Sequence, residues 1–336
     1  MNNSPKIQAF CYSWPGTQNN HAGMLYFSQS LKKDLGYPFS FFCNSPQDQS
    51  LINVAKYYAK ISASFMDCFF FMEYLSPIGP SSQENLALNL KNKGIKKPMI
   101  GLVHLPQGML LKTWDMKYIR SSLDLLDHII VYGSSLTNFL RSISYGYKTY
   151  QTFHYVDCNY YHPAPERNNN QFKVIVFGSL LRDMELLKEI VQKCPEIIFQ
   201  ICSGRLNLKQ DFANISNVLL YEYMPEGELL GLLQQANVSL SVMEDTIGSN
   251  SIVGGLACGL PQIVSDVGSI RDYCSEKNTF FCKTLDEYIK AIRLLSQNKE
   301  LCSKMGEAAR NRALELSLPN SINWFKNFFI TVVNKH

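Results

Sequence analysis

Residues 243–273 read Met-Glu-Asp-Thr-Ile-Gly-Ser-Asn-Ser-Ile-Val-Gly-Gly-Leu-Ala-Cys-Gly-Leu-Pro-Gln-Ile-Val-Ser-Asp-Val-Gly-Ser-Ile-Arg-Asp-Tyr, and this stretch decides the fold of the 336-residue chain. It follows the apolar run 238–242, which predicts a buried strand, and it continues into a helix of small side chains, a stop at Pro261 and a second strand at 262–264. The free N–H groups at a helix N-terminus favour an anion, and small residues let a ligand approach the backbone. The stretch therefore predicts a phosphate or nucleotide site in an α/β domain.

Composition places the chain among globular proteins. Hydrophobic residues make up 46% and charged residues 18%, which excludes wholesale disorder, and the length suffices for two cores of ordinary size. No apolar run reaches the roughly 18–20 residues that a membrane-spanning helix needs, and the N-terminus lacks the pattern of a signal peptide. The 10 cysteines form no C-x-x-C pair, which favours reduced thiols over disulfides or a zinc site. We therefore expect a cytoplasmic protein.

Short apolar runs alternate with amphipathic segments along the whole chain. The predicted strands are 7–12, 39–42, 68–72, 99–103, 128–132 and 149–152 in the first half, and 173–177, 198–202, 218–220, 238–242, 262–264 and 280–282 in the second. The predicted helices lie near 22–35, 48–61, 82–92, 134–144, 183–193, 226–236, 250–258, 284–297 and 299–316. This alternation favours two parallel sheets covered by helices on both faces. Prolines and asparagines in residues 160–170 suit a linker between them.

The net charge of +4 is distributed unevenly. Residues 1–160 carry 14 Lys and Arg against 9 Asp and Glu, and the remainder carries 18 against 19. Much of the excess lies in residues 91–97, Lys-Asn-Lys-Gly-Ile-Lys-Lys, and in Lys112, Lys117 and Arg120. These residues either form a solvated surface or attract anionic lipid head groups, at about 1 kcal/mol per nearby basic residue. No recognised nucleic-acid-binding motif accompanies them, so we do not expect nucleic acid as a partner.

Further segments carry a family resemblance when they are taken in order. Residues 20–24 read Asn-His-Ala-Gly-Met before a predicted helix, residues 99–106 join a strand to His-Leu-Pro, and residues 126–140 join a strand to Ser-Ser and a helix. Residues 154–163, His-Tyr-Val-Asp-Cys-Asn-Tyr-Tyr-His-Pro, precede Phe-Gly-Ser-Leu-Leu-Arg-Asp at 177–183 and Ala-Cys-Gly-Leu-Pro at 257–261. In this order and spacing, the chain resembles the retaining GT-B glycosyltransferases, the group with an acid-x7/8-acid donor motif. Tyr155 stands where that family usually has Gly.

The resemblance implies an α/β GT-B fold in which two Rossmann-like domains face a central cleft. Residues 1–160 would form the N-terminal acceptor domain, and residues 168–318 the C-terminal domain that binds the nucleotide-sugar donor. The segment 319–336 contains Trp324, Phe325, Phe328 and Phe329, and it would cross back as a helix onto the first domain. The alternative is a helix that packs on its own domain.

The chain departs from the family at Gly254. In the family, the second acid of the motif accepts hydrogen bonds from the nucleotide ribose, whereas the first acid corresponds here to Asp245, or to Glu244 one step further out. A charge-assisted hydrogen bond contributes about 1.5–3 kcal/mol. Its loss would weaken donor binding roughly ten- to a hundredfold unless another group replaces it. The first-domain glycine loop is also reduced, to Gly16 and Gly23.

Arg182 is the principal candidate for binding the donor diphosphate. It follows a predicted strand and Gly178, and a guanidinium binds oxyanions bidentately. The alternative is a solvated arginine paired with Asp183 or Glu185. Arg205, at another predicted strand end, is a weaker candidate.

The resemblance implies that His104 and Asp245 are the catalytic residues. His104 would touch the donor sugar near the bond that breaks, and Asp245 would hold sugar hydroxyls. The alternative for His104 is a histidine of the core, and the alternative for Asp245 is a helix cap. The other donor-binding candidates are Gly23, Met24, Met224, Thr246, Ile247, Gly248, Ser249 and Asn250. We interpret Glu73 and Glu84 as solvated charges on helices.

We expect a glycosyltransferase that moves a sugar, with retention, from a nucleotide-diphosphate sugar to a hydroxyl of a glycan or lipid-linked acceptor. Bacterial surface glycan synthesis, of lipopolysaccharide or capsule, is the expected setting, with peripheral contact at the inner face of an anionic membrane. No D-x-D metal motif is present, and we expect neither a metal nor another cofactor. The alternative is a non-catalytic subunit that keeps the fold and partners an active enzyme. An epimerase on the same fold is less favoured, because no suitable carboxylate cluster is visible.

Overall fold

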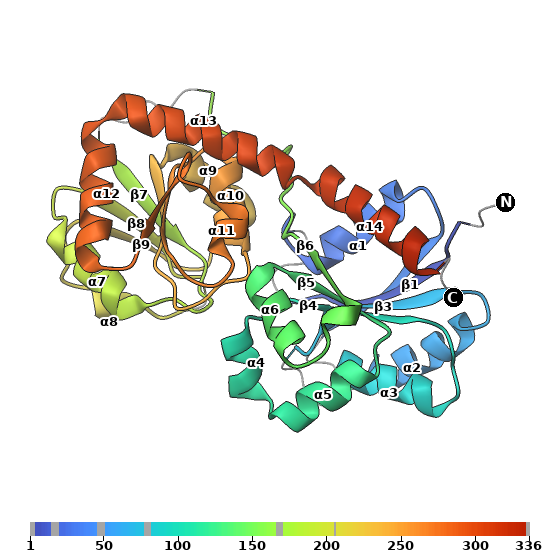
Figure 1. Cartoon of the computed structure of the whole chain (residues 1–336). Helices are drawn as coiled ribbons and strands as arrows, with labels where there is room; N and C mark the ends of the chain where they lie inside the picture. Colours follow the sequence, from blue (N-terminus) through green and yellow to red (C-terminus); the bar gives the residue numbers. More distant parts are fainter. Residues whose placement is uncertain are drawn as a thin grey trace. The chain divides into compact units, whose positions relative to one another are not determined.

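A computed structural model describes residues 4–14, 20–45, 51–76, 82–165, 171–204 and 206–333. Gly16 and Arg205 lie outside the described residues. The chain forms two compact units (Figure 1). Unit 1 comprises Met1–Phe153 and Pro319–His336, and unit 2 comprises His154–Leu318.

Unit 1 contains a six-stranded parallel sheet with the strand order β2-β1-β3-β4-β5-β6. Its strands are β1 (Ile7–Tyr12), β2 (Phe39–Asn44), β3 (Cys68–Tyr74), β4 (Met99–Val103), β5 (His128–Tyr132) and β6 (Thr149–Thr152). Every residue of β1, β3, β4 and β5 is buried, as expected for central strands of a parallel sheet that helices cover on both faces.

The helices of unit 1 come from both ends of the chain. They are α1 (Met24–Asp34), α2 (Leu51–Ser62), α3 (Gln83–Asn92), α4 (Gln107–Thr113), α5 (Met116–Asp124), α6 (Ser134–Ser142), the 3-10 helix η2 (Gly146–Lys148) and α14 (Leu318–Val333). Phe325 of α14 is fully buried, and its ring centroid lies 5.2 Å from that of Phe27 in α1 and 5.6 Å from that of Phe70 in β3. The C-terminal helix therefore completes the core of unit 1, as the resemblance implies.

Unit 2 repeats the architecture with the strand order β12-β11-β10-β7-β8-β9, again all parallel. Its strands are β7 (Lys173–Phe177), β8 (Ile198–Cys202), β9 (Val218–Tyr221), β10 (Val238–Ser241), β11 (Gln262–Ser265) and β12 (Thr279–Cys282). Its helices are α7 (Met184–Lys193), α8 (Lys209–Phe212), α9 (Glu226–Gln235), α10 (Asn250–Ala257), α11 (Ile270–Tyr273), α12 (Leu285–Gln297) and α13 (Lys299–Glu315).

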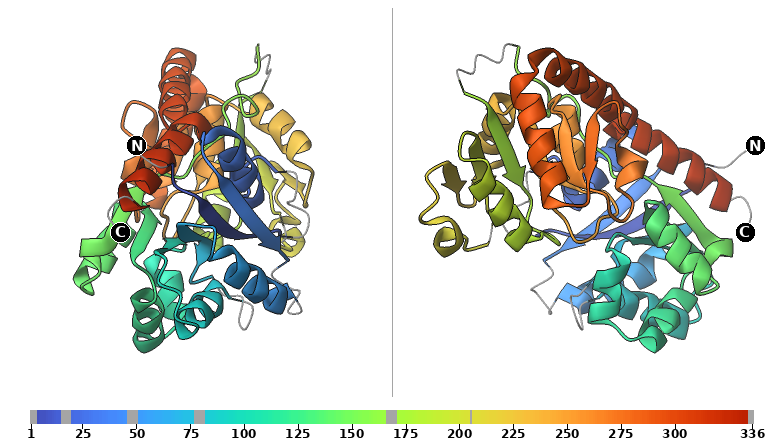
Figure 2. Two further views of the ribbon diagram at one scale, coloured as in Figure 1. Left: turned by 90° about the vertical axis from the view of Figure 1, so that its right-hand side faces the viewer. Right: turned by 60° about the vertical axis from the view of Figure 1, so that its left-hand side comes forward.

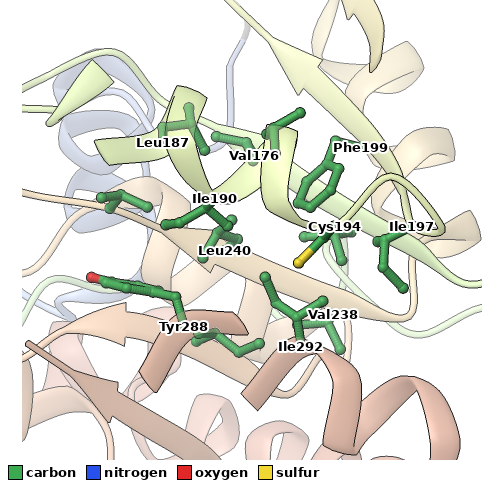
Figure 3. Close-up of a cluster of buried hydrophobic side chains, with 14 of the residues drawn as sticks. Val176, Leu187, Ile190, Cys194, Ile197, Phe199, Val238, Leu240, Tyr288 and Ile292 are labelled. Atoms are coloured by element: carbon green, nitrogen blue, oxygen red, sulfur yellow. The ribbon is translucent and has the colours of Figure 1, made fainter. Parts of the chain in front are cut away.

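The core of unit 2 lies between its sheet and the helices α7 and α12. Leu187 and Ile190 of α7 and Ile292 of α12 point toward Val176 and Leu240 of the central strands (Figure 3). Two further views show that helices cover the sheet of each unit on both sides (Figure 2). Among the described residues, no helix is both long enough and apolar enough to cross a membrane.

Two acidic residues of unit 1 are buried, which corrects their interpretation as solvated helix charges. The Glu73 carboxylate accepts hydrogen bonds from the backbone N–H of Tyr12 at 2.6 Å and from Nε1 of Trp14 at 2.9 Å. Glu84 accepts a hydrogen bond from the backbone N–H of Leu75. Burial raises the pKa of Glu73 to about 7, although these hydrogen bonds act in the opposite direction, and burial also raises the pKa of Glu84. Both acids therefore stabilise backbone turns at the carboxyl end of the sheet.

Candidate functional site

The loop that follows β7 folds back onto the end of β10. The backbone N–H of Asp183 donates to the carbonyl of Val242 at 3.2 Å, and the N–H of Glu244 donates to the carbonyl of Leu181 at 2.9 Å. Leu181 has a φ of 50°, a left-handed conformation that is uncommon outside glycine. This short antiparallel bridge brings Arg182 opposite Met243, beside the start of the loop that the sequence singled out.

The side chain of Arg182 is held in one orientation by carbonyl and hydroxyl oxygens. Its Nε donates to the carbonyl of Gly178 at 3.1 Å, and its Nη2 donates to the carbonyl of Phe177 at 2.9 Å and to Oγ of Ser251 at 2.6 Å. Nη1 is buried and has no hydrogen-bond partner among the described residues. The solvated ion pair with Asp183 or Glu185 is thus not what the structure shows, because Asp183 instead caps α7 through the N–H of Leu186.

Desolvation lowers the pKa of Arg182 to about 10, so the guanidinium remains charged at neutral pH. Gly178 makes this arrangement possible: its φ is 84°, and a Cβ there would lie 2.8 Å from Nη2 of Arg182. A buried cation with an N–H that lacks an acceptor is a favourable place for an oxyanion.

The loop between β10 and α10 is braced by the segment that follows β11. The N–H of Thr246 donates to Oδ1 of Asp245 at 2.7 Å, and the N–H of Gly248 donates to Oγ1 of Thr246 at 3.1 Å. The carbonyl of Thr246 accepts from the N–H of Ser269 at 2.7 Å. Gly248 has a φ of 94°, and a Cβ there would lie 2.2 Å from the ring of Tyr273, so a side chain is not accommodated.

Helix α10 begins beside Arg182. Ser249 is its N-cap and accepts a hydrogen bond from the N–H of Ile252 at 3.4 Å. The hydroxyls of Ser249 and Ser251 lie 2.8 Å apart, and Ser251 in turn accepts from Arg182. The capping role proposed as an alternative thus belongs to Ser249. The structure therefore brings Arg182, the loop Asp245–Ser249 and Asn250, the first residue of α10, together at the carboxyl ends of β7 and β10.

A second group of residues surrounds Gly254, in the middle of α10. A Cβ at Gly254 would lie 3.8 Å from the ring of Phe177 and 3.9 Å from the ring of Tyr161, which is ordinary van der Waals contact. The hydroxyl of Tyr161 donates to Oε1 of Glu226, the first residue of α9, at 2.8 Å. Arg310 fixes this tyrosine by donating to its carbonyl at 2.8 Å.

The sequence did not single out Tyr161 or Glu226 as site residues. Glu226 directly follows the predicted candidate Met224 and Pro225, where Pro225 is the N-cap of α9. The acidic residue after Met-Pro was the available signal, but its contact with Tyr161, 65 residues away in sequence, follows only from the fold.

The remaining candidates belong to unit 1. Gly23 is the N-cap of α1 and accepts at its carbonyl from the N–H of Phe27 at 3.0 Å, and Met24 is the first residue of that helix. His104 is half-buried and directly follows β4, two residues before the N-cap of α4. Among the described residues, no three of His, Cys, Asp and Glu are grouped so that they could hold a metal ion.

Comparison with known families agrees with this geometry. Residues 165–312 match the family described as glycosyl transferases group 1. This match supports a glycosyltransferase. Its range covers the loop after β7, the loop before α10 and Gly254. No curated protein sequence matches the chain.

Solved structures share the fold over nearly the whole chain. Sucrose-phosphate synthase from Thermosynechococcus elongatus matches with a TM-score of 0.77 at 12% identity. The superposition covers 98% of this chain and 100% of the chain of that protein. Anabaena Alr3699/HepE in complex with UDP has a TM-score of 0.73 at 13% identity, with coverage of 97% and 100%. The lipopolysaccharide outer core galactosyltransferase WaaB has a TM-score of 0.65 at 11% identity, with coverage of 96% and 99%. At these identities the similarity concerns the fold, which is the GT-B fold of two Rossmann-like domains.

Proposed function

We propose that this protein is a glycosyltransferase that moves a sugar from a nucleoside-diphosphate sugar to a hydroxyl of a glycan or lipid-linked acceptor, with retention. The observation that carries the proposal is the Arg182 guanidinium, held by three oxygens and left with a buried, unpartnered Nη1 beside the start of α10. The HepE structure in complex with UDP supports a nucleotide-sugar as donor. WaaB, a lipopolysaccharide galactosyltransferase, supports bacterial surface glycan synthesis as the setting.

In the proposed reaction, the acceptor oxygen bonds to the anomeric carbon of the sugar while the bond from that carbon to the diphosphate breaks. The leaving diphosphate gains negative charge, and the hydroxyl proton is released with it. Arg182 and the N-terminal amides of α10 stabilise that charge. Asp245 and Gly248–Asn250 position the sugar, and Met224 contacts the base. For unit 1 we keep, from the resemblance alone, His104 as a proposed catalytic residue and Gly23 and Met24 as proposed donor-binding residues. Because a cationic side chain and helix amides bind the diphosphate, we propose that the reaction needs no divalent metal.

The donor assignment is tested by the binding of UDP. A ligand that binds the folded state raises the melting temperature. Replacing Arg182→Ala removes a charge-assisted contact of about 1.5–3 kcal/mol and should weaken UDP binding roughly ten- to a hundredfold. The matched control is Arg293→Ala, because Arg293 is an exposed arginine of unit 2 that pairs with Glu196. If the Arg182 variant folds and binds UDP as tightly as the control does, the diphosphate lies elsewhere.

A second candidate function is a non-catalytic subunit that binds a glycosyltransferase partner, and Gly254 favours it because this position lacks the second acid of the donor motif. The two functions are separated by incubating the isolated protein with UDP-sugars and a chelator. Release of UDP, by transfer or by hydrolysis, supports the enzyme and its independence of metal. UDP binding without any turnover supports the subunit.

A further inference from the structure

Helix α2 of unit 1 exposes its large apolar side chains and buries its small ones. The side that packs against the unit carries Ala55, Ala59, Ser62 and Ala63, each at most 9% exposed. The opposite side carries Val54, Tyr57, Tyr58 and Ile61, followed by Phe65 just beyond the helix. Tyr57 is 68% exposed and Phe65 66%, and Val54 and Ile61 are about half exposed. We refer to these five residues as the α2 face.

The spacing of the α2 face makes it continuous. Positions 54, 57, 58, 61 and 65 follow one another at intervals of one, three or four residues, so they share one side of a helix and the turn beyond it. Packing inside unit 1 accounts only for Tyr58, whose ring meets Phe42, because the helix otherwise contacts the unit through small side chains. Singly exposed apolar residues need no explanation, whereas a contiguous exposed patch marks an interaction surface.

Neighbouring elements extend the apolar area. The ring of Tyr58 lies 5.6 Å from that of Phe42 in β2, the edge strand of the sheet, and its hydroxyl lies 3.1 Å from Oγ of Ser40. Helix α3 lies beside α2 (Figure 1), and its Leu88 is 45% exposed.

The charge carried by helix α2 is positive. Helix α2 contains Lys56 and Lys60 and no acidic residue, and Lys60 is exposed. Lys93, Lys96 and Lys97 follow at the end of α3 and in the turn to β4. Burial raises the pKa of the Cys68 thiol at the start of β3, the neighbouring Asp67 raises it further, and Lys97 lowers it, so one acid and one lysine lie close to the segment that follows α2.

The rest of the basic excess is partly engaged within unit 1, although Lys112 and Lys117 are exposed. Lys91 lies 3.6 Å from Asp127, and Nη1 of Arg120 donates to the carbonyl of Ile143 at 3.0 Å. Both side chains therefore contact other parts of unit 1. Residues 112–120 contribute no exposed large apolar side chain, whereas the α2 face contributes five, so they form the weaker docking element.

We propose that the α2 face docks unit 1 onto an anionic lipid surface. An interfacial helix inserts apolar side chains at the head-group boundary while its basic residues contact anionic lipids. Tyrosines such as Tyr57 and Tyr58 suit this boundary, since one end of the ring is apolar and the other polar. The absence of acid on α2 fits a lipid surface, whereas a second copy of the chain would set the same lysines against each other. Docking through the α2 face does not depend on how unit 2 binds the donor.

The test is co-sedimentation of the full chain with vesicles of phosphatidylethanolamine and phosphatidylglycerol in equal parts, with pure phosphatidylcholine vesicles for comparison. The parent should bind the anionic vesicles and bind the neutral ones much more weakly. The double variant Tyr57→Ser with Ile61→Ser should lose at least about tenfold in partitioning, because two large apolar side chains no longer insert. The double variant Lys56→Gln with Lys60→Gln should lose about fivefold per lysine and become less sensitive to salt.

The matched control is Tyr147→Ser, which removes an exposed tyrosine of unit 1 outside the α2 face and should leave vesicle binding unchanged. All of these side chains are at least partly exposed, so melting temperatures near that of the parent should confirm that the variants fold. UDP stabilisation of unit 2 should also be retained. The proposal is overturned if the parent does not sediment with anionic vesicles, or if the Tyr57/Ile61 variant binds as the parent does. Light scattering that shows a parent dimer and a monomeric Tyr57/Ile61 variant would also overturn it, in favour of a second copy.

Discussion

At Gly254, which is buried, the backbone of α10 passes the rings of Phe177 and Tyr161 with room for a Cβ, which would meet neither ring closer than 3.8 Å. The carboxylate of Glu226 reaches this neighbourhood by its hydrogen bond with Tyr161. The missing second acid of the donor motif therefore does not leave the region without a carboxylate.

The first prediction in this region concerns the substitution Gly254→Glu. The space around a Cβ is sufficient, so the variant should fold, and a new ribose ligand should tighten UDP binding about tenfold. The control is Gly254→Ala, which also removes the helix penalty of glycine, about 0.5–1 kcal/mol, without adding a carboxylate. Isothermal titration of the two variants separates the effects. Equal affinity for UDP in both would place the ribose elsewhere and would remove Gly254 from the donor site.

On the scale of elements, buried strands were the most predictable part of the molecule. The strands β1, β4, β5, β7 and β8 begin and end where the apolar runs predict, and the polar edge strand β6 also has the predicted bounds. A strand of a covered parallel sheet must be apolar on both faces, so its run of residues stands out against the helices. The helices α4, α5, α8 and α11 were not predicted; α4, α8 and α11 have only four to seven residues, which carry too little periodicity.

The candidate site was predictable where it depends on local sequence. Arg182 and the loop before α10 follow strands and precede helices, and the structure brings them together. Contacts between distant segments were not predictable, and Tyr161 with Glu226 is the main example. The burial of Glu73 was missed for the same reason, since its partners Tyr12 and Trp14 come from another strand and the loop beyond it.

Helix α10 offers a prediction at the scale of an element, through the substitution Ser249→Ala. Loss of this N-cap should destabilise unit 2 by about 1 kcal/mol. It should also weaken UDP binding a few fold, because Ser249 contacts Ser251, which holds Arg182. The matched control is Thr284→Ala, which removes the N-cap and capping box of α12. Calorimetry and UDP titration should show a similar loss of stability in both variants, but weaker binding only for Ser249→Ala. Weaker binding in both would mean that the effect reflects general loosening of unit 2.

On the scale of the whole molecule, the two units differ in how the chain builds them. Unit 2 is one continuous segment, whereas unit 1 needs both the first 153 residues and the C-terminal helix α14. The contacts of α14 are extensive: Phe325 and Phe329 pack against Phe70, and the carbonyl of Lys326 accepts a hydrogen bond from the hydroxyl of Tyr37 at 3.1 Å. Unit 1 therefore cannot complete its core until the last helix is present.

This dependence predicts that a change in α14 destabilises unit 1 and spares unit 2. Replacing Phe325→Ala removes a fully buried ring and should cost about 3–5 kcal/mol. The control is Asn327→Ala on the exposed side of the same helix, which should cost less than about 0.5 kcal/mol. In calorimetry with and without UDP, the transition that UDP raises is assigned to unit 2, and Phe325→Ala should lower the other one. If Phe325→Ala instead lowers both transition temperatures by the same amount, the two units unfold as one cooperative body. Destabilisation of the unit 1 core lowers the UDP-dependent transition only when the units unfold together.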